Sequence, residues 1–537
     1  MTIRDPILEG IGAGWQVIDA SKLEADRELE ADVAIVGSGA GGGIAAEILT
    51  KAGLKVVVVE EGPLKSSTDF RMRESDAYPQ LYQESAARKT KDKAINVLQG
   101  RCVGGSTTVN WTSSFRTPPT TLAHWQREYG LKELSVEALA PWFDAVERRL
   151  NIRYWDVSPN ENNALLRQAG WTLGVPVAPM RRNVKGCWNL GYCGMGCPTN
   201  AKQSMLVTTL PAALAGGATL VHHLRAERLA LRGGRAEALE GTAMQAAGIQ
   251  PLPYRLRIRA RHFVLAAGAI GTPALLLRSH APDPQRLLGR RTFLHPTTVA
   301  AALMGHAVKG YAGAPQAIYS DHFLDSVPVG GPIGYKLEVP PIHPVLFATT
   351  LHGYGEMHRN LMAEFANTHA MLALLRDGFH PDSPGGSVQL RDDGTPLLDY
   401  PITDFVWDGV RRSWLTMAEL QFAAGARRVY IVHEQCGGYA SLAAAQAGIA
   451  QLPLQPQLAR VVSAHVMGGC GMAADEKQGV ADVWGRYRQL GNVTVCDGSL
   501  FPTSIGANPQ QSVYGLAARN ASRLAEELTA RPAPALA

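Results

Sequence analysis

Apolar and polar positions near the start of the chain mark out a strand, a turn, a helix and a second strand. The apolar run ADVAIV at residues 31–36 is typical of a buried parallel strand. A glycine-rich turn and an alanine-rich segment follow and end at Gly53, which predicts a helix with glycine just beyond its last turn. The run VVVVE at residues 56–60 predicts a second buried strand that ends on an acid.

Later segments show both kinds of periodicity. Residues 387–404 (SVQLRDDGTPLLDYPITD) contain two strand-like runs around an Asp-Gly turn, and residues 406–423 have the pattern of an amphipathic helix. A second helix-like run, residues 510–528, follows Pro509, a residue type that favours the first turn of a helix. The apolar residues 341–351 (PIHPVLFATTL) favour a buried strand, with a peripheral membrane contact as the alternative.

The strand-turn-helix-strand block has the arrangement that binds a dinucleotide. Gly37 permits a sharp turn out of the strand, Gly39 permits close approach of backbone to a pyrophosphate, and Gly42 permits close contact between helix and strand. The helix start, at Ala40, would face the phosphates. Glu60 lies 23 positions after Gly37, near the roughly 20 expected for the acid that binds the adenosine ribose. This unit alone serves flavins and nicotinamides equally.

Three further blocks carry a resemblance to a known family. They are GRCVGGSTTVN at residues 100–110, GAIGTPALLL at 268–277, and HVMGGCGM leading to VCDGSLFPTSIGANP within 465–509. With the first block, they resemble the glucose-methanol-choline oxidoreductases, which bind FAD and oxidise alcohols. The segments GCWNLGYCGMGCPTNAKQS and GYKLEVPPIHPVL are most similar to the long-chain or fatty alcohol oxidase branch.

The order of the blocks predicts an interleaved α/β architecture. A Rossmann-like FAD-binding domain is expected to be left and re-entered twice, with an α+β substrate-binding domain, built on an antiparallel sheet, roofing the flavin. We expect the FAD-binding domain at residues 31–115, 205–300 and 460–530, a cysteine-containing insertion or lid at 116–204, the substrate-binding domain at 301–459, and a disordered tail at 531–537.

The resemblance places the catalytic pair at His465 and Asn508. An imidazole with an unperturbed pKa of about 6.5 suits removal of a hydroxyl proton near neutrality, and Asn508 would donate a hydrogen bond to the developing alkoxide. The alternatives are a hydrogen-bonded core histidine for His465 and a helix N-cap for Asn508.

The same resemblance implies the remaining cofactor contacts. Val109 stands where relatives with covalent FAD carry the linking histidine, so we expect noncovalent FAD. Asp497 has a turn-forming carboxylate as its alternative role. The expected cofactor-binding residues are Gly37, Gly39, Ala40, Gly42, Glu60, Arg101, Gly104, Gly105, Ser106, Asn110, Asp497, Gly498, Asn508 and Pro509.

The sequence contains cysteine and histidine clusters that are candidate metal sites. Cys187, Cys193 and Cys197 are spaced as iron-sulfur ligands can be, but Trp188 replaces an adjacent cysteine of cluster-bearing relatives, so free thiols or a disulfide are favoured. The neighbours His222 and His223 lie in a strand-like segment and should face opposite sides. His295 is expected to be structural, and His352 and His358 to be polar loop residues. No metal is expected.

Composition narrows the partners and the location. The chain has 537 residues, 46% of them hydrophobic, and a net charge of +5, with no block of like charges. These features fit a large enzyme with a small-molecule substrate and exclude a nucleic-acid partner. The N-terminus lacks a basic start followed by an apolar core, and no apolar run approaches the length of about 18 residues that a membrane span needs. We therefore expect a cytoplasmic protein.

The predicted function is FAD-dependent oxidation of an accessible, apolar alcohol of medium or long chain to the carbonyl. The alternative is a cyanohydrin lyase, because some similar proteins keep FAD and the histidine while cleaving cyanohydrins. The electron acceptor stays open between oxygen, a quinone and a cytochrome, and the oligomeric state is open too.

Overall fold

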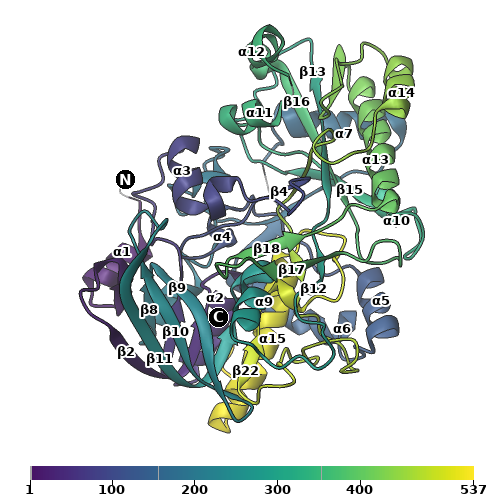
Figure 1. Cartoon of the computed structure of the whole chain (residues 1–537). Coiled ribbons are helices and arrows are strands. Elements are labelled where there is room, and N and C mark those ends of the chain that lie inside the picture. Colours follow the sequence, from purple (N-terminus) through teal and green to yellow (C-terminus); the bar gives the residue numbers. More distant parts are fainter. Residues whose placement is uncertain (1–2, 155–156, 352, 537) are drawn as a thin grey trace.

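The computed structural model describes residues 3–154, 157–351 and 353–536, which form two lobes built on separate sheets (Figure 1). The sheet of the lower lobe has the strand order β1-β8-β3-β2-β11-β10-β9, with β22 paired to β11. Its strands are β1 (Val17–Asp19), β8 (Thr219–His222), β3 (Val56–Val59), β2 (Arg27–Val36), β11 (Pro251–Leu265), β10 (Arg235–Met244), β9 (Leu224–Arg232) and β22 (Val493–Val495).

The predicted βαβ unit is confirmed. Strands β2 and β3 pair in parallel, and helix α2 (Ala40–Lys51) connects them. Gly53 follows the helix with φ of +85°, as expected for a glycine beyond the last turn. Helix α2 is almost wholly buried because α15 (Gln510–Thr529) and α8 (Thr209–Ala215) pack against it. The carboxyl ends of β2 and β3 therefore meet the start of α2 at one edge of the sheet.

The sheet of the upper lobe is mainly antiparallel, as the sequence predicts. Its order is β4-β20-β13-β16-β15-β14-β6, with β19 paired to β13, and helix α13 (Asp404–Ala423) packs on it. This helix confirms the prediction for residues 406–423. The strands are β4 (Ile95–Val97), β20 (Val461–Ser463), β13 (Thr297–Leu303), β16 (Thr368–Leu375), β15 (Tyr335–Glu338), β14 (Ile318–Ser320), β6 (Ala178–Pro179) and β19 (Arg428–Ile431).

A four-stranded sheet lies between the lobes, in the order β18-β17-β12-β21 (Figure 1). The two strands predicted around the Asp-Gly turn are its β17 (Gly386–Leu390) and β18 (Pro396–Asp399). They pair with β12 (Arg290–Phe293) and, through it, β21 (Met467–Gly468), so they do not belong to the roofing sheet in which the sequence placed them.

The strand predicted at residues 341–351 is wrong. Residues 341–351 do not form a strand: α11 (Pro344–Thr350) begins there, with proline in its first turn and the Glu74 carboxylate accepting from the amides of Val345 and Leu346. The membrane contact considered for this segment stays a prediction. Ala533 and Leu536 pack against an apolar cluster of the lower lobe. The disorder expected for residues 531–537 stays a prediction.

The other elements complete the two lobes. The prediction of a helix after Pro509 is confirmed by α15. The remaining α-helices and strands are α1 (Pro6–Gly12), α3 (Glu74–Leu81), α4 (Ser106–Val109), α5 (Pro119–Tyr129), α6 (Val136–Arg149), β5 (Ile152–Tyr154), α7 (Glu161–Leu173), β7 (Arg181–Asn183), α9 (Gly268–Arg278), α10 (His322–Asp325), α12 (Gly355–Ala363) and α14 (Leu442–Gln451).

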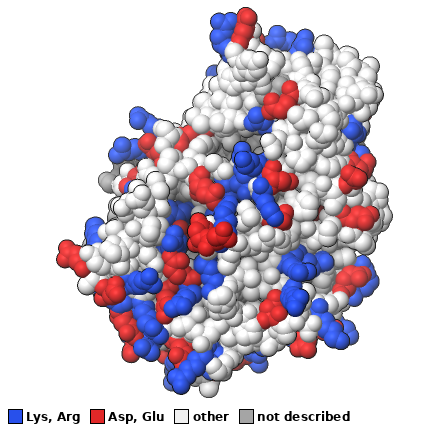
Figure 2. All heavy atoms as spheres, in the orientation of Figure 1, with Lys and Arg blue, Asp and Glu red and all other residues white. Residues whose placement is uncertain are grey.

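Surface charge is mixed. Figure 2 shows basic and acidic side chains interspersed over the lower lobe, with mostly uncharged surface on the upper one. Among the described residues, no helix combines the length and apolar character that crossing a membrane requires.

Candidate active site

Two glycines of the fingerprint, Gly37 and Gly42, make backbone contacts that leave no room for a side chain. A Cβ on Gly37, whose φ is +98°, would lie 2.2 Å from the carbonyl oxygen of Ala266, and one on Gly42 would lie 1.9 Å from the carbonyl oxygen of Gly37. Gly41, which the sequence analysis did not single out, is tighter still, at 1.4 Å from the carbonyl oxygen of Cys496. The start of α2 is therefore fixed between β2 and the C-terminal block.

A second glycine loop faces the first. A Cβ on Gly105 would lie 2.8 Å from the Cα of Gly39, so the two backbones approach face to face. Ser106 is exposed, and Gly39, Ala40 and Gly105 are half-buried, although residues on both sides of them are buried. The N-terminal amides of α2, which an α-helix leaves without intrahelical acceptors, thus lie beside partly exposed backbone of both glycine loops.

Glu60 and Ser38 tie the two loops together. The Glu60 carboxylate accepts from the Ser38 hydroxyl at 2.6 Å and from the Gly62 amide at 2.9 Å, while the Ser38 oxygen accepts from the Gly104 amide at 2.9 Å. Burial raises the pKa of Glu60. This acid sits at the end of β3, where the sequence predicted the ribose contact.

Asp497 joins two blocks that are 229 positions apart in the chain. Its carboxylate accepts from the Gly268 amide at 2.9 Å, the Thr272 hydroxyl at 2.6 Å and the Ser499 amide at 2.8 Å. The bond from the Ser499 amide makes Asp497 the N-cap of the short helical turn that begins at Gly498. The turn-forming role considered for Asp497 is therefore confirmed. Asp497 therefore holds α9 and the C-terminal block together.

Two other predicted cofactor residues have side chains engaged within the protein. The Arg101 guanidinium pairs with the Glu61 carboxylate at 3.1 Å and donates to the Gly248 carbonyl at 2.8 Å. The Asn110 side chain donates to Gln510 at 2.6 Å. Arg101 lies in the loop between β4 and α4, and Asn110 directly follows α4.

The residues at this edge of the sheet fit FAD. Two glycine loops in close approach and a helix N-terminus offer donors to a dinucleotide pyrophosphate, and a buried acid at the end of β3 is the acceptor that the ribose hydroxyls require. The FAD itself would supply a two-electron acceptor next to the residues described below.

His465 and Asn508 come together, although 43 positions separate them. His465 Nε2 lies 3.4 Å from Asn508 Nδ2. Withdrawal from water, reinforced by the Lys336 ammonium, lowers the pKa of His465 to about 4. Asn508 is 5% exposed and makes no cap to α15, whose N-cap is Pro509, so the N-cap alternative is wrong.

Glu338 also belongs to this cluster, although the sequence motifs do not include it. It lies at the end of β15 with no exposed surface, and its Oε2 accepts from Asn508 Nδ2 at 3.2 Å and from Gln316 Nε2 at 2.7 Å. Its Oε1 is buried with no hydrogen-bond partner in the part of the chain that the structure describes. Burial raises the pKa of this carboxyl to about 7. The available signal was an acid two residues after Lys336 in an otherwise apolar strand.

His295 also belongs to the site, contrary to the structural part expected for it. Its Nδ1 lies 3.3 Å from His465 Nδ1, and its Nε2 accepts from the Gly506 amide at 2.9 Å. The Asp377 carboxylate fixes this loop by accepting from the amides of Leu294 and His295. Burial lowers the pKa of His295 well below its usual range.

The prediction that His222 and His223 face opposite sides is wrong. His223 leaves the strand in a left-handed conformation, with φ of +56°, which breaks the alternation of side chains. Its Nδ1 lies 3.1 Å from His222 Nδ1 and 2.9 Å from Asp19 Oδ1, a spacing that metal ligands also adopt. The same Asp19 oxygen accepts from the amide and hydroxyl of Ser21, so this group acts as a hydrogen-bonded link between β1 and β8.

The three clustered cysteines are free thiols. Cys187 Sγ accepts from the Asn189 amide, Cys193 Sγ accepts from Arg182, and Cys197 Sγ contacts the Thr199 hydroxyl. Within the described ranges they do not form a group with the spacing of metal ligands. Free thiols, one of the favoured readings, are therefore present.

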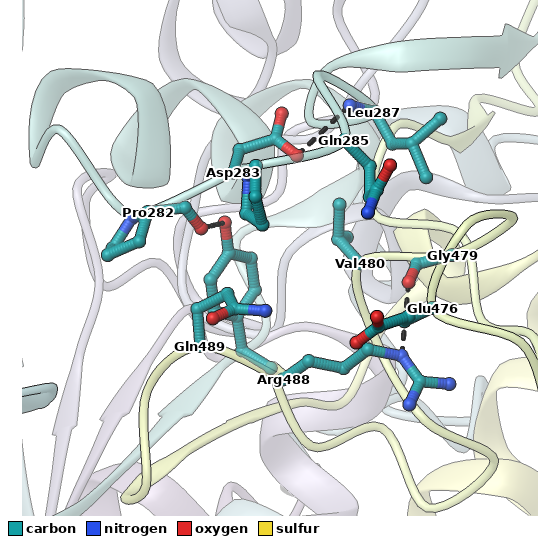
Figure 3. Close-up of a pocket in the computed structure, with 11 residues that line it drawn as sticks. Pro282, Asp283, Gln285, Leu287, Glu476, Gly479, Val480, Arg488 and Gln489 are labelled. Carbon is teal, nitrogen blue, oxygen red and sulfur yellow. Dashed lines mark hydrogen bonds between the residues drawn. The ribbon is translucent and has the colours of Figure 1, made fainter.

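Of the two histidines predicted in a loop, the structure describes one. His352 lies outside the described residues, whereas His358 lies in α12, where its Nε2 is 3.0 Å from the Ala348 carbonyl oxygen, so His358 is not a loop residue. A surface pocket lined by residues 282–287 and 476–489 (Figure 3) contains none of the predicted site residues. Its polar groups bond internally, as when Tyr487 donates to the Pro282 carbonyl at 2.9 Å.

Comparison with known families matches most of the chain. Residues 78–297 and 381–517 match the two models described as GMC oxidoreductase, and residues 32–72 match an FAD-binding domain. The cofactor-binding fold expected from the sequence is thereby confirmed.

Individual relatives agree. An uncharacterized GMC-type oxidoreductase of Mycobacterium tuberculosis is 32% identical over 91% of this chain and 74% of its own length. A long-chain-alcohol oxidase of Arabidopsis thaliana is 28% identical over 95% of this chain and 69% of its own length. Among solved structures, pyridoxine 4-oxidase from Mesorbium loti has a TM-score of 0.67 at 20% identity, covering 92% of this chain and 98% of that one, which shows a shared fold.

Proposed function

Because this chain belongs to the glucose-methanol-choline (GMC) oxidoreductases, we propose that it uses FAD to oxidise an alcohol to the aldehyde or ketone. The observation that carries the proposal is the meeting of half-buried His465 with buried Asn508 and Glu338 in one cluster at the boundary of the two lobes. Such a cluster offers hydrogen-bond donors and a proton acceptor to a single hydroxyl group.

The proposed roles follow from the donors and acceptors present. His465 and Asn508 hold the oxygen of the alcohol, and the hydroxyl proton passes to a group of the same cluster. FAD, when bound, would supply the two-electron acceptor for the hydride of the carbinol carbon. Arg101, Asn110 and Gly498 are proposed to reach the cofactor through backbone atoms, since the Arg101 and Asn110 side chains bond to protein groups.

A primary alcohol with a medium or long apolar chain is the proposed substrate. The support is the similarity to long-chain-alcohol oxidases of Arabidopsis thaliana, two of which are 28% and 26% identical over 95% and 93% of this chain. We also propose that FAD is bound noncovalently, because Val109 offers no nucleophile for a covalent link.

The test is anaerobic mixing of the FAD-loaded protein with a panel of alcohols of increasing chain length. An alcohol oxidiser loses the visible absorbance of oxidised flavin and releases the carbonyl product. A cyanohydrin lyase would instead cleave cyanohydrins while its flavin stays oxidised. Repeating the active reactions with oxygen, a quinone and a cytochrome identifies the electron acceptor.

A further inference from the structure

We infer, on the basis of the proposed alcohol oxidation, that Glu338 accepts the hydroxyl proton and that His465 is held as a hydrogen-bond donor to the same oxygen. This assignment differs from the base role that the sequence motif predicts for His465. It follows from a chain of hydrogen bonds that begins at a backbone amide, whose donor character is fixed.

The chain starts at Gly506. Its N–H donates to His295 Nε2 at 2.9 Å, so this nitrogen carries no proton and the neutral ring holds its proton on Nδ1. His295 Nδ1–H then faces His465 Nδ1 at 3.3 Å and donates to it. A neutral His465 whose Nδ1 accepts must carry its proton on Nε2. The tautomers of both rings are thus assigned from one backbone group.

The tautomer of His465 determines what its Nε2 can do on the other side of the ring. Its Nε2–H lies 3.4 Å from Asn508 Nδ2, which is also a donor, so neither group satisfies the other. One acceptor placed between them can take both hydrogen bonds. A hydroxyl oxygen, with two lone pairs, is such an acceptor, and it leaves its own proton to be received elsewhere.

Glu338 is the acceptor next to this pair. Gln316 and Asn508 both donate to its Oε2, which favours the carboxylate form. Its Oε1, sealed from solvent and without a partner in the described residues, is the oxygen available for the hydroxyl proton. A buried acceptor left without a donor costs free energy, which a hydroxyl group in the site would relieve.

The charged neighbours of Glu338 set its titration. On its own strand, Lys336 is held between the rings of Phe115 and Tyr319 and pairs with Asp321 at 2.6 Å. The Lys336 ammonium favours the Glu338 carboxylate and Asp321 opposes it, but burial dominates and brings the pKa to about 7.

From the facing segments come His465 and His295. The pKa values of both are depressed, so the two rings are neutral where Glu338 titrates.

The step balances. The O–H bond breaks and its proton forms a new O–H bond on Glu338 Oε1. The electron pair of the former O–H bond forms the second carbon-oxygen bond, while the hydrogen of the carbinol carbon leaves with its electron pair; bound FAD would supply the acceptor for this hydride. His465 and Asn508 donate to the oxygen throughout and change no covalent bond.

The first test needs no substrate. In the FAD-loaded protein with 15N-labelled histidine, NMR should show His465 with a proton on Nε2 and none on Nδ1, and His295→Phe should abolish that preference. Infrared titration should show a carboxyl band that loses its proton near neutral pH and is absent in Glu338→Gln. A His465 that lacks the Nε2 proton, or a band that persists in the variant, would overturn the assignment.

The second test is the anaerobic rate of flavin reduction. In the wild-type protein this rate should rise with pH through the pKa of Glu338, because the carboxylate is the active form. Glu338→Gln, which keeps the shape of the side chain, should lower the rate by about 10²–10⁴-fold and flatten the profile. Glu364→Gln, the same change on a half-exposed acid paired with Arg427, is the control and should leave the profile unchanged.

A wild-type rate of flavin reduction in Glu338→Gln would refute the role of Glu338 as proton acceptor. If no alcohol reduces the wild-type flavin, the proposed function fails instead. The NMR and infrared results still decide the proton arrangement in that case.

Discussion

At the scale of single residues, the site depends on side chains whose donor and acceptor characters are fixed by their neighbours. The sequence motif located His465 and Asn508 because both belong to recognisable blocks, and the structure brings them to 3.4 Å. It could not locate Glu338 or His295, since nothing in a linear pattern shows that β15 and the loop after β12 converge on those blocks. Long-range pairing of strands, which single-sequence patterns do not encode, creates that part of the site.

Replacement of His465 by alanine tests its contact with substrate. His465→Ala should lower the anaerobic rate of flavin reduction by about 10²–10⁴-fold, because the oxygen loses a positioned donor or base. His306→Ala, which removes an exposed histidine paired with Glu161, serves as the control. A wild-type reduction rate in His465→Ala would exclude it from the site.

Val109 offers a test of how the cofactor is held. Acid precipitation of the wild-type protein should release all of its flavin, since a buried valine cannot form a link. Val109→His places a nucleophile where relatives with covalent FAD carry one, and we expect part of the flavin to remain with the precipitate. Yellow precipitate from the wild-type protein would contradict noncovalent binding.

At the scale of elements, the βαβ unit was predictable and α11 was not. The glycine spacing, the alanine-rich helix and the VVVVE strand each reflect local requirements, and all three formed as expected. Residues 341–351 are apolar enough for a strand, but Pro344 starts a helix and the Glu74 carboxylate, far away in the sequence, caps it. A distant cap of this kind overrides local preference.

The contact of Gly41 with Cys496 predicts a strong effect of one methyl group. Gly41→Ala should destabilise the protein by about 1–3 kcal/mol or more, because overpacking displaces α2 from β22, and should weaken FAD retention. Thermal unfolding and the flavin-to-protein absorbance ratio measure both effects. Gly12→Ala is the matched control, since a Cβ there meets nothing within 4 Å. Equal stability and equal FAD retention in the two variants would show that the contact of Gly41 with Cys496 does not exclude a methyl group.

At the scale of the whole molecule, the proposed FAD site is assembled from segments spread over the chain. Asp497 binds groups 225 and 229 positions away, and Ser38 binds Gly104 across 66 positions. The interleaving of the two lobes was predictable from the order of the motifs. The domain boundaries were less predictable. Strands β4 and β20 lie in ranges assigned to the FAD-binding domain, yet they pair with each other in the upper sheet.

Such an assembly should make folding stability depend on FAD. Adding FAD to the apoprotein at about 100 times its dissociation constant should stabilise the folded state by about 2.7 kcal/mol, and both lobes should unfold in one transition, because shared strands and loops couple them. Calorimetry with and without FAD measures this. Two transitions, with only one responding to FAD, would contradict the coupling.

The most direct test of the central claim is single-turnover reduction of the FAD-loaded protein by a long-chain primary alcohol without oxygen, comparing ordinary and carbinol-deuterated substrate. We predict loss of the oxidised flavin spectrum, formation of an equal amount of aldehyde, and a several-fold slower reaction with deuterium. A flavin that stays oxidised with every alcohol, while a chemical reductant still bleaches it, would contradict the account.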